Sequence, residues 1–414
     1  MVRMSIEDTK PDGSQPKLSK PNNLRVEYDT YWNQFNTERM KNLHTLLASQ
    51  GITPIYVQFG IDPKWLDKDK NFVGSYVNEL AEYWAAHVVW MKKNGITPKY
   101  IELFNEPDYN DTNGNGNGYV KPSDYNSIVK AVRRILDERD CSATRIVGPG
   151  RAHFNVGAKD EWVDELDADG IRAIDAWSIH SYEWGKPEDI NNPQYVRDNW
   201  NGFQNSVKAK DPSHSKPIFL TEHATKCTTF DGCTYDSDDE KGKVDNFASN
   251  THYYGVRVFE NALSFINMGA NSIIVWQACD QCWGEACNES RNPQFFWGME
   301  KLDGTKRPVY YAMKTLSTVV PAGAFVLKSP PQAKTGIYAA AFTTGDRFIA
   351  AFANGTADPD TITVNVNNAS ISFLKAEAMI NGAIESKFLT VAKNSFIVDL
   401  PGYSTLVVTL AMSR

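Results

Sequence analysis

Long apolar runs and clusters of positive charge are both missing from this sequence. No apolar run approaches the roughly 20 residues that a helix needs to cross a bilayer. The chain carries a net charge of −7 at pH 7, and its 43 lysine and arginine residues are not concentrated in any one stretch. These absences argue against a membrane-spanning protein, and against nucleic acid or an anionic membrane as the main partner.

A complete set of zinc ligands is also missing. Cys279 and Cys282 have the spacing of a zinc-binding pair, but no second close cysteine pair and no His-x-x-x-His motif accompanies them. The six cysteines are Cys141, Cys227, Cys233, Cys279, Cys282 and Cys287. Because this even number lies mostly in loop-like segments, disulfide bonds are favoured, with Cys227 and Cys233 as the easiest local pair, and zinc is the alternative. We expect neither a metal nor an organic cofactor.

No signal peptide is recognisable in residues 1–4, which lead directly into a strand-like segment. Four Asn-x-Ser/Thr sequons begin at Asn110, Asn288, Asn354 and Asn368. Sequons and disulfide bonds are both features of exported proteins. We therefore expect a secreted, extracellular protein.

One short loop resembles part of a calcium site. Residues 111–116 match the first half of a calcium-binding loop, Asp-x-Asn-x-Asn-Gly. The glutamate that closes such a loop is missing, because Pro122 stands at the twelfth position. We therefore interpret residues 113–118 as a turn-rich loop, with calcium as the alternative.

The composition is that of a folded globular protein, with 42% hydrophobic, 12% aromatic and 22% charged residues. At 414 residues, the chain exceeds the usual size of a single core, which predicts a large domain with a smaller companion. The phrase Gly-Ile-Thr-Pro occurs at residues 51–54 and again at 95–98, each time between an amphipathic stretch and a β-rich run. Each glycine is predicted to end a helix that feeds a strand.

The two amphipathic stretches have helical spacing. The first is expected to place Met40, Leu43 and Leu47 on one face. The second is expected to place on one face Tyr76, Leu80, Trp84, Val88 and Met91.

Strand-like segments alternate with helical patterns through the first three quarters of the chain. They are residues 2–6, 55–59, 100–104, 145–147, 176–180, 218–221 and 273–276. This alternation predicts a parallel α/β sheet or barrel. A (β/α)8 TIM barrel needs eight strands, so seven leave one unaccounted for.

We expect a TIM barrel over residues 1–320. If Glu106 and Glu222 follow strands four and seven, the strand beginning at Val2 is the second. The first strand is then missing from the front of the chain. Either the chain is truncated there, or an unusual element closes the barrel.

The composition changes after Pro321. Alternating β-branched and aromatic residues with Asn/Gly turns at residues 347–352, 361–366 and 405–409 predict antiparallel strands. We expect residues 321–414 to form a β-sandwich domain.

Two glutamates end apolar, strand-like runs. Glu106 stands in the phrase Phe-Asn-Glu-Pro-Asp, and Glu222 in the phrase Leu-Thr-Glu-His, about three strand-plus-helix units later. A single glutamate at a strand end is usually a solvated charge. Two on the same rim of a barrel match the acid and nucleophile that retaining glycosidases hold about 5 to 5.5 Å apart.

The wider motifs, residues 101–109 and 220–223, resemble the two signatures of clan A glycoside hydrolases, and most of all those of glycoside hydrolase family 30. The resemblance implies that Glu106 is the acid/base and Glu222 the nucleophile. Asn105 would contact a sugar hydroxyl next to the reacting carbon. The resemblance spans residues 2–320, and the family's β-sandwich matches the tail. The first barrel strand, and the sandwich strands that the family often contributes from before it, are missing.

Further positions match the same pattern. His180 and Tyr182 share one face of a strand and resemble the histidine and tyrosine that border the nucleophile in the clan. Arg3 would match the clan's arginine near the nucleophile, and Trp276 its sugar-stacking tryptophan after strand eight. Trp184, in a loop on the same rim, is a further candidate for stacking on a sugar ring.

The sequence therefore predicts a monomeric retaining β-glycoside hydrolase with a carbohydrate substrate and two catalytic glutamates. Residues 275–278 resemble those of β-1,6-galactan-cleaving members of the family, while xylan and β-1,6-glucan stay open. Families 39 and 5 share the Asn-Glu-Pro motif. The rival is a non-catalytic carbohydrate-binding protein, because a barrel without its first strand need not hold the carboxylates at reactive distance.

Overall fold

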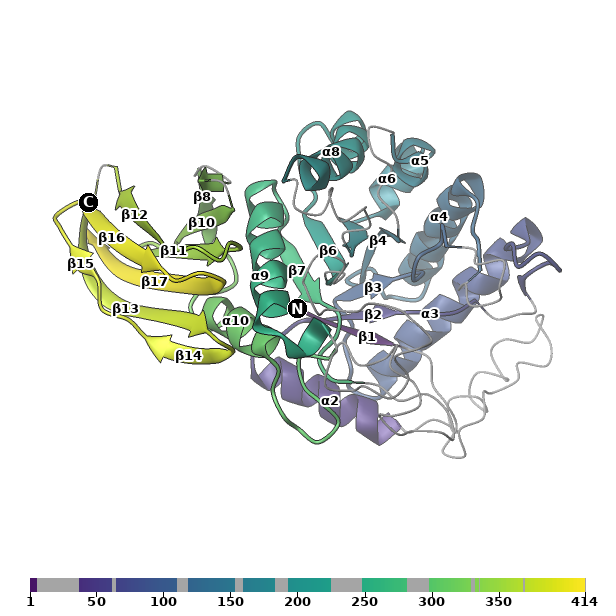
Figure 1. Ribbon diagram of the computed structural model, residues 1–414. Helices are drawn as coiled ribbons and strands as arrows, with labels where there is room; N and C mark the ends of the chain where they lie inside the picture. The colour runs from purple at the N-terminus through teal and green to yellow at the C-terminus, as the bar shows by residue number, and fades with distance from the viewer. Residues whose placement is uncertain are drawn as a thin grey trace, which may run out of the picture. The chain divides into compact units, whose positions relative to one another are not determined.

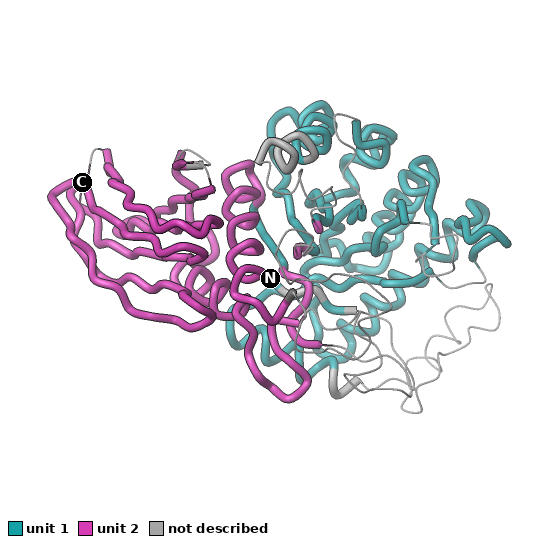
Figure 2. The backbone as a smooth tube through the Cα atoms, in the orientation of Figure 1, with its two compact units in different colours: residues 1–181, 193–222, 271–274 teal, residues 182–192, 223–270, 275–414 magenta. Residues whose placement is uncertain are grey.

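The computed structural model of the chain (Figure 1) describes residues 1–5, 37–61, 65–109, 118–152, 159–182, 193–224, 248–280, 298–328, 332–334, 336–367 and 369–413. Its contacts group into two compact units (Figure 2). Unit 1 comprises Met1–Ser181, Pro193–Glu222 and Asn271–Ile274, and unit 2 comprises Tyr182–Asn192, His223–Ala270 and Val275–Arg414. Because the units interleave along the chain, the boundary at residue 320 stays a prediction.

A seven-stranded sheet has its strands side by side in the order of the sequence. The strands are β1 (Val2–Ser5), β2 (Pro54–Val57), β3 (Tyr100–Glu102), β4 (Arg145–Arg151), β5 (Ala176–Ser181), β6 (Ile218–His223) and β7 (Ser272–Val275). Neighbouring strands from β1 to β5 pair in parallel. The predicted parallel α/β sheet is confirmed, whereas its closure into a complete barrel stays a prediction.

Helices alternate with these strands, as the periodicity predicted. They are α2 (Thr37–Ser49), α3 (Val77–Lys93), α4 (Pro122–Glu138), α5 (Glu161–Asp164), α6 (Ala168–Ala173), α8 (Pro193–Lys210), α9 (His252–Asn267) and α10 (Pro308–Ser317), with 3-10 turns η3 (Gly74–Tyr76) and η6 (Ala248–Asn250). Gly51 and Gly95 follow α2 and α3 with φ of 68° and 78°, which confirms both as helix stops. No described helix is long and apolar enough to cross a membrane.

Burial explains why these strands form one sheet. Every residue of β2, β3, β5 and β6 is buried, as a parallel sheet covered on both faces requires. One hydrophobic cluster takes one residue from each of β2 to β7, namely Ile55, Tyr100, Val147, Ala176, Phe219 and Ile274. These six neighbouring strands therefore share one hydrophobic core.

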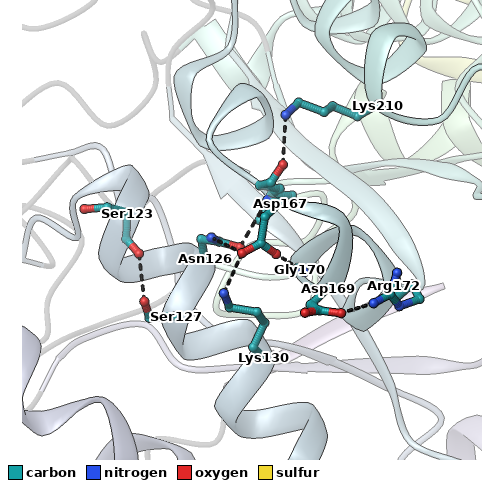
Figure 3. A network of polar contacts seen from close by, with 10 residues as sticks. Ser123, Asn126, Ser127, Lys130, Asp167, Asp169, Gly170, Arg172 and Lys210 are labelled. Atoms are coloured by element: carbon teal, nitrogen blue, oxygen red, sulfur yellow. Dashed lines mark hydrogen bonds and ion pairs between the residues drawn. The ribbon is translucent and has the colours of Figure 1, made fainter.

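Polar contacts join the helices that cover the sheet in unit 1 (Figure 3). Asp167 caps α6 by accepting the Gly170 N–H at 2.8 Å, and it also accepts from Lys130 Nζ of α4 at 2.6 Å. Lys210 at the end of α8 donates to the Leu166 carbonyl at 2.8 Å. The hydrogen bond from Lys130, followed by that from Gly170, lowers the pKa of Asp167 to about 2.

Unit 2 contains two antiparallel sheets. Their strands are β8 (Phe325–Leu327), β9 (Gln332–Lys334), β10 (Ile337–Thr343), β11 (Arg347–Asn354), β12 (Asp360–Asn365), β13 (Ser370–Ile380), β14 (Ala383–Ser386), β15 (Thr390–Val391), β16 (Ser395–Leu400) and β17 (Ser404–Ser413). The larger sheet runs β14-β13-β17-β11-β10-β8 with β9 beside β10, and the smaller runs β12-β16-β15. A core that includes Phe348 and Phe396 lies between them, so the predicted β-rich tail with antiparallel strands is confirmed.

The structure differs from two of the sequence predictions. The strand predicted at residues 145–147 extends to Arg151, because Gly148 and Pro149 continue the pairing with β5. Leu43 was expected on one face with Met40 and Leu47, but it is 41% exposed, whereas Met40 and Leu47 are each 9% exposed. At 3.6 residues per turn, Leu43 lies about 60° around the helix axis from Met40, whereas Leu47 lies only about 20° from Met40. Leu43 therefore lies outside the buried face of α2.

The signals for export receive little support from the described residues. Cys141 and Cys279 carry free thiols. The other four cysteines lie outside the described residues, namely Cys227, Cys233, Cys282 and Cys287. The calcium-like loop 111–116 and the sequons at Asn110, Asn288 and Asn368 also lie outside them. Asn354 is fully buried, and its Nδ2 donates to the carbonyls of Asp358 at 2.9 Å and Pro401 at 3.1 Å. This sequon is therefore a structural amide in the folded protein. Disulfide bonds and secretion stay predictions.

Candidate active site

Glu106 stands on a sharp bend just beyond β3. Its backbone has φ of 53°, a left-handed conformation that is uncommon outside glycine and costs about 1 to 3 kcal/mol. Two hydrogen bonds hold the bend: the Glu106 N–H donates to the Gly150 carbonyl at 3.0 Å, and the Tyr109 N–H donates to the Glu106 carbonyl at 2.9 Å. Such strain at a glutamate within a rigid frame is typical of functional sites.

Gly150, the partner of Glu106, is the extra residue of a bulge in β4. The register between β4 and β5 shifts between Pro149 and Arg151, and Gly150 has φ of 68°. Glycine adopts this conformation without steric cost, and bulges often lie beside active sites, where they redirect neighbouring groups. Here the bulge turns a carbonyl toward the backbone of Glu106.

Glu222 and His180 meet Glu106 in unit 1. Glu222 lies within β6 with a side chain 4% exposed, and the Glu106 side chain is 17% exposed. His180 of β5 is fully buried, with Nδ1 3.0 Å from Glu106 Oε1 and 3.5 Å from Glu222 Oε2. One ligand atom from each of the three side chains lies within 4.8 Å of the others. The fold thus brings together three of the residues singled out in the sequence.

The remaining sequence candidates have different standings. Asn105 is buried next to Glu106, and its N–H donates to the Gln58 carbonyl at 2.9 Å, which fixes it beside the end of β2. Arg3 lies on β1 opposite Ile55 of β2, but its side chain is outside the described residues.

The aromatic candidates are not placed relative to the carboxylates. Trp184 is outside the described residues. Tyr182 and Trp276 belong to unit 2, where the Trp276 N–H donates to the His223 carbonyl at 2.8 Å. Their contacts with a substrate stay predictions.

A buried ion-pair cluster that sequence reasoning missed holds Asp108, two residues beyond Glu106. Arg151 Nη1 lies 2.8 Å from Asp160 Oδ2, and its Nε lies 3.4 Å from Asp108 Oδ2. Asp108 also accepts the Ala152 N–H at 2.8 Å, and the guanidinium stacks 4.5 Å from the ring of Trp162. Asp108, two residues beyond Glu106, is thereby fixed to the end of β4. In the sequence, the one sign of this cluster was the aspartate of the Asn-Glu-Pro-Asp motif, Asp108.

The charge on Arg151 is maintained by its partners. Burial acts to lower the pKa of Arg151, but the carboxylates of Asp160 and Asp108 outweigh it and raise the pKa. An ion pair this deep is strongly disrupted when one partner is removed, because the other is left buried without compensation.

Glu102, the last residue of β3, is a buried acidic residue that the sequence analysis did not single out. It is fully buried, and its Oε1 accepts hydrogen bonds from Ser178 Oγ at 2.7 Å and from Thr221 Oγ1 at 2.9 Å. Burial raises the pKa of the neighbouring Tyr125, and the charge of Glu102 adds to that effect. Glu102 lies too deep to meet a substrate, so its contacts are internal.

No protein-family model and no curated protein matches the sequence. Solved structures do match. An endoxylanase of glycoside hydrolase family 30 from Clostridium papyrosolvens shares 17% identity at a TM-score of 0.65, with 99% of this chain and 95% of that chain covered. A family 30 subfamily 8 xylanase from Clostridium acetobutylicum shares 15% identity at a TM-score of 0.64, with 89% and 82% covered.

An endo-β-1,6-glucanase shares 16% identity at a TM-score of 0.63, with 100% of this chain and 82% of that chain covered. These likenesses extend over both units of the chain. The resemblance to glycoside hydrolase family 30 that the motifs indicated is thereby confirmed as a likeness of fold.

Proposed function

We propose that this protein is a retaining β-glycoside hydrolase that cleaves a β-linked polysaccharide or oligosaccharide with Glu106 and Glu222. The observation that carries the proposal is the short separation of the two side chains, with one oxygen of each within 4.8 Å. Retaining enzymes hold their carboxyl groups about 5 to 5.5 Å apart, whereas inverting enzymes need about 6.5 to 9.5 Å to admit a water molecule. The 4.8 Å limit joins single oxygen atoms and not the carboxyl centres, and this close approach supports the retaining arrangement.

The environments of the two glutamates support different roles. Glu222, within a buried strand and 4% exposed, is suited to attack the anomeric carbon and form the glycosyl-enzyme. Glu106, 17% exposed at the bend, is suited to protonate the leaving oxygen and then to activate water. Between them, an N–H at His180 Nδ1 can donate to whichever carboxylate is ionised at each step.

The structural neighbours suggest which substrates to test first. Two are xylanases and one is an endo-β-1,6-glucanase. We therefore propose to test xylan and β-1,6-glucan beside β-1,6-galactan, which the resemblance of residues 275–278 favours. The specific sugar is part of the proposal, because the structural likeness extends to the fold alone.

The direct test is release of reducing ends from these glycans and from mixed β-glucans. We expect activity on at least one glycan, a fall of several orders of magnitude in Glu106→Gln and Glu222→Gln, and no change in Glu138→Gln, an exposed glutamate of α4. Proton NMR of the first product should show the β-anomer. Binding to a glycan without reducing-end release by the wild type would instead support the non-catalytic carbohydrate-binding protein.

A further inference from the structure

Glu102 occupies a position that the proposed reaction leaves without a role. It ends β3 four residues before Glu106, and its Oε1 accepts two hydroxyl hydrogen bonds, from Ser178 of β5 and Thr221 of β6. A single buried oxygen atom therefore joins three strands of the sheet.

The two hydroxyl donors stand next to the residues of the candidate site. Thr221 directly precedes Glu222 in β6, and Ser178 lies two residues before His180 on the same side of β5. The strand that carries Glu102 itself leads to Glu106. Two of the three strands joined at Glu102 thus carry His180 and Glu222, and the third leads to Glu106.

The bulge of β4 adds a fourth strand to this arrangement. A Cβ at Gly150 would lie 2.7 Å from Glu102 Oε1 and 3.1 Å from the Phe104 carbonyl, so only a glycine leaves room for the carboxyl group. The same Gly150 offers its carbonyl to the Glu106 N–H. One residue therefore contacts both the Glu102 side chain and the backbone of Glu106.

We propose that Glu102 is a positioning residue that sets the separation between Glu106 and Glu222. The inference rests on the proposed function and deepens it. Moving β5 or β6 away from β3 would break a buried hydrogen bond to Glu102 Oε1, and this cost opposes changes in the spacing of the three strands. Displacements of about 1 Å in an active site can cost about a hundredfold in rate, and the separation of two catalytic carboxyl groups is sensitive to such displacements.

The test removes the hydroxyls and leaves Glu102 in place, because a Glu102 variant can fail to fold. Thr221→Val removes the hydroxyl at nearly constant volume, Thr221→Ser keeps it, and Ser178→Ala removes the second donor. The matched control is Thr144→Val, which removes the buried hydrogen bond from Thr144 Oγ1 to the Pro98 carbonyl at 3.0 Å. Thr144 precedes β4, in the same unit but at the opposite end of the strands.

Each variant is measured for kcat and KM on a glycan that the wild type cleaves, and its crystal structure is determined. We expect Thr221→Val and Ser178→Ala to lower kcat about tenfold or more with KM within about twofold, while Thr221→Ser and Thr144→Val retain the wild-type kcat. In the crystals, the separation between the Glu106 and Glu222 carboxyl groups should grow only where kcat falls.

The positioning role is overturned if Thr221→Val keeps the kcat of Thr144→Val, or if its carboxyl separation is unchanged. Failure of the proposed function looks different, because the wild type would then cleave no glycan or Glu106→Gln and Glu222→Gln would stay active. In that event the crystal structures decide alone: a separation that grows in Thr221→Val and not in Thr144→Val supports the role of Glu102.

Discussion

His87 lies on α3 with its ring buried against Tyr83 and Trp84, at centroid distances of 4.2 and 6.1 Å. Burial lowers its pKa from 6.5 to about 3, against the opposing effect of the Tyr83 carbonyl. Between these two pH values the unfolded chain binds a proton at this residue and the folded protein does not. The stability that neutral His87 preserves is therefore complete above pH 6.5 and declines as the pH falls toward 3.

Replacing His87 with leucine should reduce this acid sensitivity. For one proton, the expected decrease in the pH slope of the unfolding free energy is at most about 1.4 kcal/mol per pH unit between pH 6.5 and 3. Urea denaturation of wild type and His87→Leu at several pH values in this range measures the slope. Equal slopes for the two proteins would contradict the prediction.

Gly150 offers a second prediction about one residue, because Gly51 provides a control with the same φ of 68°. A Cβ at Gly51 would meet nothing within 4 Å, whereas one at Gly150 would lie 2.7 Å from Glu102 Oε1. Gly51→Ala should cost about 1 to 2 kcal/mol of unfolding free energy from the left-handed conformation alone. Gly150→Ala should lower the unfolding free energy by clearly more than Gly51→Ala does, and it should also lower kcat. Chemical denaturation measures the first effect and initial rates measure the second. Equal losses in both variants would show that the close approach to Glu102 is unimportant.

At the scale of single elements, the bend at Glu106 to Asp108 is held by the ion pairs of Arg151 with Asp160 and Asp108. Arg151→Met should lower the unfolding free energy by about 3 to 5 kcal/mol, because it leaves buried carboxylates without a counter-charge. The control is Arg134→Met, which removes an exposed ion pair with Glu138 on α4 and should change stability little. Urea denaturation compares the two. A loss in Arg151→Met no larger than in the control would mean that the cluster does not hold the bend.

The helices and strands could be predicted from the sequence, whereas the contacts between them could not. Gly51 and Gly95 mark their helix ends locally, and the period of the apolar residues marks the strands, so the alternating helices and strands could be predicted. The hydrogen bonds to Glu102 come from residues 76 and 119 positions away, and no local pattern encodes such partners. The bulge at Gly150 was missed for a related reason, since Gly-Pro-Gly reads as a turn unless a neighbouring strand continues it.

At the scale of the whole molecule, the sequence predicted a parallel sheet followed by an antiparallel β-rich region, because helical and strand periods alternate in the first part and only the strand period continues in the second. It also placed Glu106 and Glu222 on one rim from the count of strands between them, and the structure brings them together with His180. What the count could not supply is whether the sheet closes into a barrel, because closure depends on contacts between the first and last strands, which lie far apart in the sequence.

Metal removal tests the reaction as a whole. Glu106, His180 and Glu222 include atom types that also bind metals, but in the proposed mechanism both carboxylates react directly with the substrate. Activity should therefore be unchanged after prolonged dialysis against EDTA. Loss of activity that added zinc or calcium restores would contradict the two-glutamate mechanism and favour a metal held by these side chains.

The buried amide of Asn354 bears on how the protein should be produced. In the folded chain its Nδ2 is occupied by backbone carbonyls at the junction of β11 with the segment that follows β16. An oligosaccharide attached there during synthesis would have to occupy space that the folded unit fills. In a host whose secretory pathway glycosylates sequons, molecules left unmodified at Asn354 would fold and modified ones would not. The yield of folded protein would then depend on whether folding or glycosylation of Asn354 comes first.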